Sequence, residues 1–236
     1  MKKLLLVLLS APLLAFASDV ELHLDKAPDH SRDFAALQHG AKVFVNYCLN
    51  CHSASYMRYN RLTDIGLTDK QIKDNLLFTA DKVGEPMTIA MKSADSKVWF
   101  GAAPPDLTVI ARARSSEFGS GSDWLYTYLR GFYRDSERPT GWNNVVFENV
   151  GMPHVLWELQ GDQVMGADHK LKLEEPGKLS PQEYDAMVGN LVAFLAYMGE
   201  PMAEFRKSLG VVVLIALAVL FVFAYALKRE YWKDIH

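Results

Sequence analysis

The sequence predicts a mainly α-helical domain with loop insertions, followed by one C-terminal transmembrane helix. Three observations support this fold class. Apolar residues recur at helical spacing in two long segments, an uncharged run of 19 residues lies near the C-terminus, and Gly, Pro and Asp are frequent between the helical segments. Residues 60–178 are therefore expected to form loops and short helices, with a short strand at 142–147.

The N-terminus has the pattern of a secretory signal peptide over residues 1–17. Two lysines precede an apolar run, and Ala15-Phe16-Ala17 puts small residues where a signal peptidase would cut before Ser18. The run is too short to span a bilayer comfortably, and the alternative is a short buried helix. Cleavage at this point would leave residues 18–205 as an exported domain.

Residues 48–52, Cys-Leu-Asn-Cys-His, form a heme c attachment motif. Cys48 and Cys51 lie on a short turn, so that each thiol can add to one vinyl group of the same porphyrin, and His52 can then reach the iron. The motif predicts one covalently bound heme c with His52 as a metal ligand. A thioredoxin-like thiol pair is one alternative, but no βαβ pattern surrounds the motif. A structural zinc site is another, but it needs four ligands, and the chain has two cysteines.

Two helices are expected to frame this motif. From Ser31 onward, apolar side chains fall on one helical face: Phe34, Leu37, Ala41, Phe44, Val45 and Cys48. Gly40 lies inside that helix at a cost of about 1 kcal/mol relative to Ala, which is reasonable if another helix crosses closely there. The expected partner is residues 180–199, which begin with a capping box of Ser180 and Glu183. This arrangement is the general plan of a cytochrome c-like heme domain.

The second axial position of the iron is open to several residues. Met152 is favoured because the loop Gly151-Met152-Pro153 restricts its backbone, so that its thioether would lose little entropy on ligation. The alternatives that remain are Met87, Met91, Met165 and His154. Ligation by Met and His would raise the reduction potential relative to two His ligands.

The C-terminal region predicts a membrane anchor. Leu209–Leu227 carries no charge and would form about 28 Å of helix, close to the hydrocarbon thickness of a bilayer. We expect the anchor at residues 206–228 and a cytoplasmic tail at residues 229–236, with a buried core helix as the alternative. Given the export signal, the chain is expected to be a single-pass protein of a bacterial inner membrane, with its large domain in the periplasm.

The exported part is acidic, with 18 Lys and Arg against 26 Asp and Glu in residues 18–205. Such a surface repels nucleic acid, which we exclude as a partner, and suits a basic protein partner through electrostatic steering. Plain solubility explains the same charge equally well.

Several motifs together resemble the cytochrome c1 family over residues 30–236. They are the stretch CHSASYMRYNRL at residues 51–62, GAAPPDL at 101–107, RAR at 112–114 followed by DWLY at 123–126, and GMP at 151–153. The resemblance implies that Met152 is the axial ligand, that Arg114 pairs with a heme propionate, and that Pro105 lines the heme edge. The chain departs from some relatives in having no cysteine beyond the heme pair. Without a disulfide, the Met152 loop is expected to be braced by its proline and by packing, from Pro153, Val155, Leu156 and Trp157.

The same resemblance implies a function and partners. The chain would accept an electron from the Rieske iron–sulfur protein and pass it to a soluble cytochrome c, as a subunit beside cytochrome b in a dimeric, lipid-embedded bc1 complex, the quinol–cytochrome c oxidoreductase. No nucleophile–base pair or open metal position is evident, so the chain itself is expected to do no bond chemistry on a substrate. The alternatives are a membrane-tethered cytochrome shuttle or terminal-oxidase subunit, a heme enzyme or sensor with an open iron, and a heme-free thiol oxidoreductase.

Overall fold

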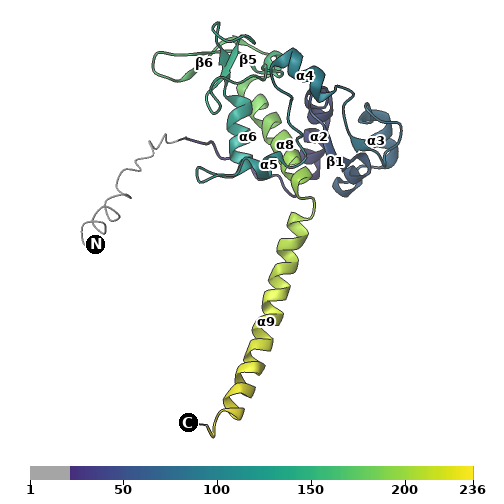
Figure 1. Ribbon diagram of the computed structural model, residues 1–236, viewed down its shortest axis with the longest axis vertical. Helices are drawn as coiled ribbons and strands as arrows, with labels where there is room; N and C mark the ends of the chain where they lie inside the picture. Colours follow the sequence, from purple (N-terminus) through teal and green to yellow (C-terminus); the bar gives the residue numbers. More distant parts are fainter. Residues whose placement is uncertain (1–21, 236) are drawn as a thin grey trace, which may run out of the picture.

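The computed structural model describes residues 22–235, which form a helical domain and one long helix that leaves it (Figure 1). The predicted signal peptide, residues 1–17, lies outside the described residues. The helices of the domain are α2 (Phe34–Val43), η2 (Phe44–Cys48), η3 (Tyr59–Ile65), α3 (Asp69–Asn75), α4 (Ser93–Phe100), α5 (Ile110–Ala113), α6 (Gly121–Arg130), α7 (Trp157–Gln160) and α8 (Pro181–Gly199). The mainly α-helical prediction is confirmed.

The two predicted long helices form and cross each other. α2 begins at Phe34, where the Asp33 side chain caps it by accepting from the Ala36 amide, and it continues as the π-helical turn η2 to Cys48. α8 begins with the predicted Ser180–Glu183 capping box. At the crossing, a Cβ on Gly40 would lie 2.1 Å from the Asn190 carbonyl oxygen, so this position admits no side chain. The prediction that Gly40 allows a close helix crossing is confirmed.

Among residues 22–235, three small antiparallel sheets complete the domain. β1 (Ala54–Arg58) pairs with β2 (Pro86–Met87), β3 (Phe132–Arg134) with β4 (Trp142–Asn144), and β5 (Gly161–Met165) with β6 (Leu171–Pro176). The strand expected at 142–147 is present but ends at Asn144, because the Asn144 side chain accepts hydrogen bonds from the Val146 and Phe147 amides and turns the chain. The β5–β6 hairpin was not predicted.

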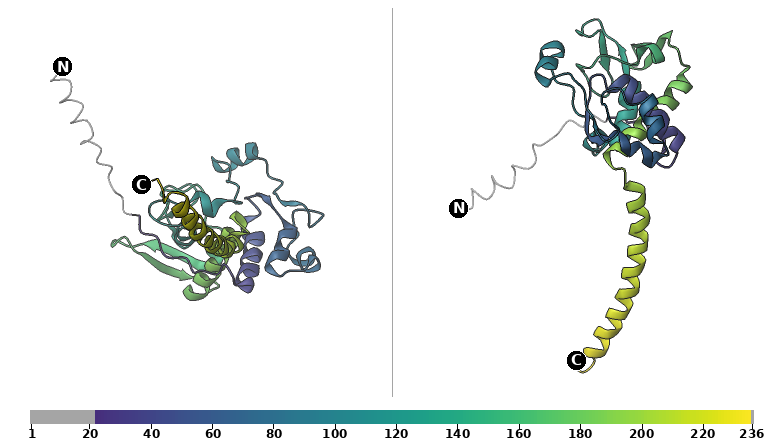
Figure 2. Two further views of the ribbon diagram at one scale, coloured as in Figure 1. Left: turned by 90° about the horizontal axis from the view of Figure 1, so that it is seen from below. Right: turned by 90° about the vertical axis from the view of Figure 1, so that its right-hand side faces the viewer.

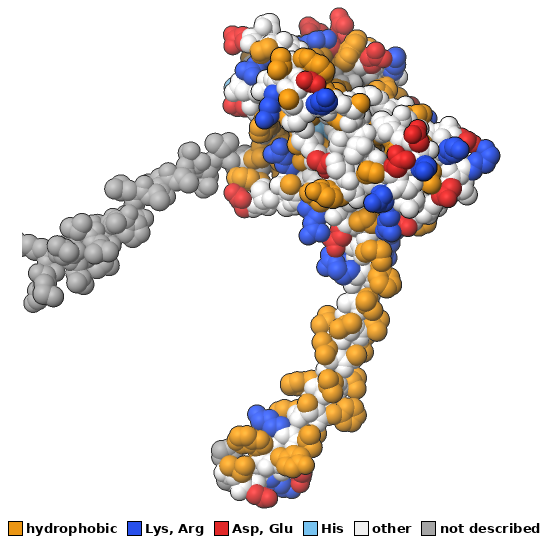
Figure 3. Space-filling view, turned by 45° about the vertical axis from the view of Figure 1, so that its right-hand side comes forward, with side chains coloured by type: hydrophobic (Ala, Val, Ile, Leu, Met, Phe, Trp, Pro, Cys, Tyr) orange, Lys and Arg blue, Asp and Glu red, His pale blue; other side chains and the backbone are white. Residues whose placement is uncertain are grey.

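The long helix α9 (Ala203–Tyr231) extends away from the domain (Figures 1 and 2). Within the described residues it is the one helix long and apolar enough to cross a membrane, with a mean hydropathy of 2.9 in its most apolar window, and none of that window is buried. Figure 3 shows hydrophobic side chains along the visible face of this helix, with charged side chains near both ends. The predicted C-terminal apolar helix is thus confirmed, and its length and composition fit a membrane anchor.

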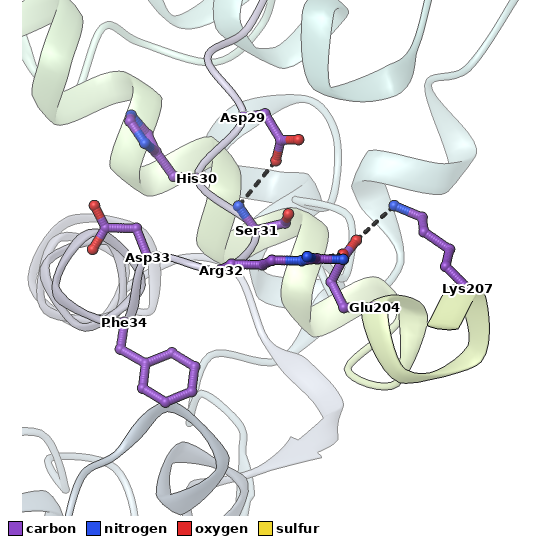
Figure 4. Close-up of a pocket in the computed structure, with 8 residues that line it drawn as sticks. All are labelled: Asp29, His30, Ser31, Arg32, Asp33, Phe34, Glu204 and Lys207. Carbon is purple, nitrogen blue, oxygen red and sulfur yellow. Dashed lines mark hydrogen bonds and ion pairs between the residues drawn. The ribbon is translucent and has the colours of Figure 1, made fainter. Parts of the chain in front are cut away.

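Ion pairs join the start of α9 to the domain, at the junction between α8 and α9. Glu204 accepts from Arg32 at 2.8 Å and from Lys207 at 2.6 Å, so that the segment before α2 is tied to the start of α9 (Figure 4). Glu200 accepts in the same way from Arg112 at 3.2 Å and from Arg206 at 2.7 Å. Solvent screens these exposed pairs, so they orient α9 relative to the domain more than they stabilise the fold.

Asp123 ties the N-terminal segment to α6. Its carboxylate accepts from the Ala27 amide at 2.8 Å and from the Ser120 amide at 3.4 Å, and Lys26 lies 3.5 Å away. Burial acts to raise the pKa of Asp123, but these hydrogen bonds and the lysine outweigh it, so that the net pKa lies below its usual value.

We expect Asp123→Asn to lower the free energy of unfolding by about 1 to 2 kcal/mol at pH 7, because hydrogen bonds to a charged acceptor are lost. A carboxyl whose pKa is lowered on folding stabilises the protein above its unfolded pKa, near 4, and this contribution is lost as the pH falls. The difference between wild type and variant should therefore shrink below about pH 4. This difference in the free energy of unfolding is measured by guanidinium titration in detergent at several pH values, with circular dichroism as the signal. A difference that is constant between pH 7 and pH 3 would contradict the assignment.

Candidate heme-binding site

One apolar cavity brings the predicted site residues together. It lies between α6, α8, the loop before α5 and the loop that carries Met152. All six predicted residues line it: Cys48, Cys51, His52, Pro105, Arg114 and Met152. Aromatic and aliphatic side chains form most of the remaining wall, including Trp124, Leu125, Tyr128, Leu129, Leu191 and Leu195. An apolar cavity with a few convergent polar groups is typical of a cofactor site.

The turn after η2 holds the thiols and the imidazole together. The Cys48 carbonyl accepts from the amides of both Cys51 and His52, at 3.1 and 2.9 Å, which keeps the turn tight. The two cysteines are not joined in a disulfide. Burial raises the pKa of the Cys48 thiol to about 12, and the adjacent Cys51 adds to this rise. A thiol with a raised pKa is poorly reactive, so the surroundings of Cys48 do not favour a role as a redox-active thiol.

His52 is held in the orientation that a metal ligand requires. Its Nδ1 donates to the Pro105 carbonyl at 2.7 Å, which fixes the tautomer and leaves Nε2 as the acceptor nitrogen. Burial lowers the pKa of His52, although the Pro105 carbonyl and the nearby Asp106 oppose the shift, so the imidazole is neutral near pH 7. The resemblance implied that Pro105 lines the heme edge, but not that its carbonyl orients His52. Every residue has a backbone carbonyl, so the sequence does not show which carbonyl accepts a hydrogen bond from His52.

Met152 is half-buried and lines the same cavity. Its sulfur accepts a hydrogen bond from the Tyr128 hydroxyl at 3.4 Å. None of the four alternative ligands is among the residues that line this cavity in the described chain: Met87, Met91, Met165 and His154. Of these, Met87 is fully buried in the core. The geometry therefore favours Met152 over the other candidates.

The Met152 loop is braced differently from the prediction. Leu156 is buried as expected and Val155 packs against the core, but Trp157 is 47% exposed and does not brace the loop. His154 takes that place, 2% exposed, with its ring stacked on Phe132 at 4.8 Å and meeting the edge of Trp142 at 4.9 Å. The burial of His154 lowers its pKa to about 4, which keeps its imidazole neutral. The sequence around His154 does not indicate that its ring packs between two aromatic side chains.

Arg114 is half-buried at the wall of the cavity. Its guanidinium lies 4.5 Å from the centre of the Trp124 ring and 5.8 Å from that of Phe147. Among the described residues no carboxylate lies within ion-pair distance of it. A half-buried cation without a protein partner fits an anionic group of a ligand in the cavity.

These residues fit a heme. Two thiols and a neutral imidazole with one available nitrogen share a cavity with a thioether, and an arginine suited to a propionate lies at its wall. Soft thioether and imidazole donors are the axial ligands of electron-transferring hemes. The fold and the site together define a membrane-anchored cytochrome of the c type.

Comparison with known proteins gives the family. The model of the Cytochrome C1 family matches residues 25–235. Cytochrome c1 of Allochromatium vinosum is 50% identical over 250 residues that cover all of both chains. A protein of Nitrosomonas europaea named ammonia monooxygenase gamma subunit is 48% identical over 236 residues, covering all of this chain and 98% of that one. Cytochrome c1 of Rhodospirillum rubrum is 29% identical over 231 residues, 86% of this chain and 83% of that one.

The chain belongs to the cytochrome c1 family. Members of this family are the electron-transferring heme subunit of the bc1 complex, and this chain is such a subunit, carrying heme c and anchored in a membrane.

Proposed function

We propose that this chain carries a single heme c, bound covalently through Cys48 and Cys51, with His52 and Met152 as the axial ligands of its iron. The observation that supports this most strongly is the shared cavity, in which the Pro105 carbonyl holds His52 with Nε2 available. When bound, the heme supplies an iron that alternates between the ferric and ferrous states and so carries one electron at a time.

The residues around the cavity would have separate roles in binding the heme. Each cysteine thiol would add across one vinyl group, the sulfur bonding to carbon and the proton going to the neighbouring carbon, which anchors the heme permanently. The apolar wall would exclude water, so that little solvent has to reorganise when the charge of the iron changes. Arg114 would pair with a propionate, and its stacking on Trp124 would keep it at the wall of the cavity.

The expected topology follows from the order of the chain. Residues 1–17 would be a signal peptide, residues 18–205 the periplasmic heme domain, residues 206–228 the transmembrane anchor, and residues 229–236 the cytoplasmic tail. The helix itself runs from Ala203 to Tyr231, so that the basic residues at its two ends would lie at the headgroup level.

The proposed partners are cytochrome b and the Rieske iron–sulfur protein of a dimeric bc1 complex in a bacterial inner membrane, with a soluble cytochrome c as acceptor. Affinity purification from detergent-solubilised membranes tests this assembly. Cytochrome b should accompany the chain. Recovery of terminal-oxidase subunits, or of the chain alone, would contradict the assembly and support an oxidase subunit or a tethered shuttle.

Replacing both motif cysteines by alanine is expected to abolish heme that survives denaturation, because no thioether bond remains. Cys51→Ala alone should leave one vinyl group intact and shift the pyridine hemochrome band to longer wavelength. Heme staining on denaturing gels and hemochrome spectra of purified protein measure these effects. Asn50→Ala is the matched control, because Asn50 is exposed in the same turn and its side chain only donates to the Asn46 carbonyl. If acidified acetone extracts the heme from wild-type protein, covalent attachment is wrong.

A further inference from the structure

We propose that the Tyr128 hydroxyl raises the reduction potential of this heme through its hydrogen bond to the Met152 sulfur. This inference rests on the proposed function, because it requires Met152 to be an iron ligand. Tyr128 is then a positioning residue, since it acts on the iron through the thioether.

The geometry of the hydrogen bond carries the proposal. The Tyr128 hydroxyl oxygen lies 3.4 Å from the Met152 sulfur, within the range for a sulfur acceptor, and it has no other hydrogen-bond partner among residues 22–235. Both residues line the same cavity. The hydroxyl must donate here, because a thioether sulfur offers only lone pairs.

The ring of Tyr128 is fixed, so the direction of its hydroxyl is fixed as well. Tyr128 is 9% exposed, its ring stacks on Trp124 with centroids 4.7 Å apart, and it meets the edge of Phe132 at 5.1 Å. The Tyr128 carbonyl also accepts from the fully buried Asn144 side chain at 2.8 Å, which holds its backbone against β4.

The donor and the acceptor are braced by the same aromatic group. Phe132, which packs on the Tyr128 ring, also stacks on His154, two residues beyond Met152. Phe132 therefore contacts both the ring that carries the donor and a residue of the loop that carries the acceptor. Such a preorganised contact loses little entropy on forming.

The expected effect follows from the electron demand of the iron. A hydrogen bond to the thioether withdraws electron density from its sulfur, which makes it a poorer donor. Ferric iron depends on that donation more than ferrous iron does, so the hydrogen bond favours the ferrous state. Hydrogen bonding to ligands is one of the protein's means of setting a heme potential.

Tyr128→Phe tests the inference in the full-length, heme-loaded protein in detergent, because phenylalanine keeps the ring and its stacking and removes only the hydroxyl. The midpoint potential should fall below that of wild type, and the sulfur-to-iron charge-transfer band of the ferric protein should shift. The reduced variant should still not bind carbon monoxide, because Met152 would remain bound to the iron. Tyr184→Phe is the control, because the buried Tyr184 hydroxyl donates to the Leu129 carbonyl at 2.9 Å and does not line the cavity. It should lower stability and leave the potential unchanged.

Two outcomes would overturn the inference, and they are distinguishable. If Tyr128→Phe has the potential of wild type while Met152→Leu gains carbon monoxide binding, the hydrogen bond does not tune the iron, and the proposed ligand stands. If Met152→Leu behaves as wild type toward carbon monoxide, Met152 is not a ligand. The proposed ligation then fails and the inference fails with it. An equal fall in potential in Tyr184→Phe would also overturn it, because any lost buried hydroxyl would have the same effect.

Discussion

Met152→Leu is expected to convert a heme that ignores carbon monoxide into one that binds it. Leucine has no donor atom, so the sixth position of the ferrous iron would become free for an exogenous ligand. The midpoint potential should fall as well, because water or hydroxide would take the vacant position in the ferric protein, and such a hard oxygen donor stabilises ferric iron more than a soft thioether does. Visible spectra of the reduced protein with and without carbon monoxide measure the first effect, and a redox titration measures the second.

Met87→Leu is the matched control for this substitution. Met87 is a fully buried methionine that does not line the cavity, and the exchange of Met for Leu in a core costs less than about 1.5 kcal/mol. It should leave the heme inert to carbon monoxide. If Met152→Leu also stays inert, another residue ligates the iron. If wild type already binds carbon monoxide, the site is open, and a heme enzyme or ligand sensor becomes the better hypothesis.

Gly40→Ala is expected to prevent normal folding of the heme domain. The added methyl group would lie 2.1 Å from the Asn190 carbonyl oxygen and 2.8 Å from the Phe194 Cβ, neither of which can rotate away. α2 and α8 would have to separate, at a cost of about 3 kcal/mol or more, the upper end for overpacked sites. Because α2 leads directly into the heme motif, the yield of heme-loaded protein should fall with stability.

Gly84→Ala serves as the control for this second substitution. A Cβ at Gly84 meets nothing within 4 Å, and its backbone is not left-handed. The variant should therefore fold and carry heme as wild type does. Thermal unfolding and the ratio of heme absorbance to protein absorbance report both variants. If Gly40→Ala has the same stability and heme content as wild type, the close crossing of α2 and α8 is wrong.

The sequence predicts the parts of the fold that depend on local chemistry. The Ser180–Glu183 capping box marks the start of α8. The apolar stripe marks the buried face of α2 from Leu37 onward, but Phe34 at its start is 52% exposed. Gly40 indicates where the two helices cross, because glycine inside a helix is costly unless a neighbour needs the space. The uncharged run at Leu209–Leu227 predicts the anchor from length and hydropathy alone.

Other features depend on pairings between distant residues and leave no local pattern. β6 is almost entirely exposed and β5 is mostly half-buried, so neither strand buries an apolar face, and both are too short to give a strong alternating pattern. The packing of His154 between Phe132 and Trp142 joins three segments whose proximity only the folded chain reveals. The heme motif and the resemblance to cytochrome c1 point to six residues that line the cavity. They do not predict the contacts of Pro105 with His52 and of Tyr128 with Met152.

Quinol-driven reduction of this heme in intact membranes is the most direct test of the proposal that the chain carries electrons within a bc1 complex. The absorption band of reduced heme c should appear when quinol is added to membranes that contain the wild-type chain, and it should decay when oxidised soluble cytochrome c follows. Membranes with the variant that lacks both motif cysteines should show neither change. A heme that dithionite reduces but quinol does not would contradict the proposed role.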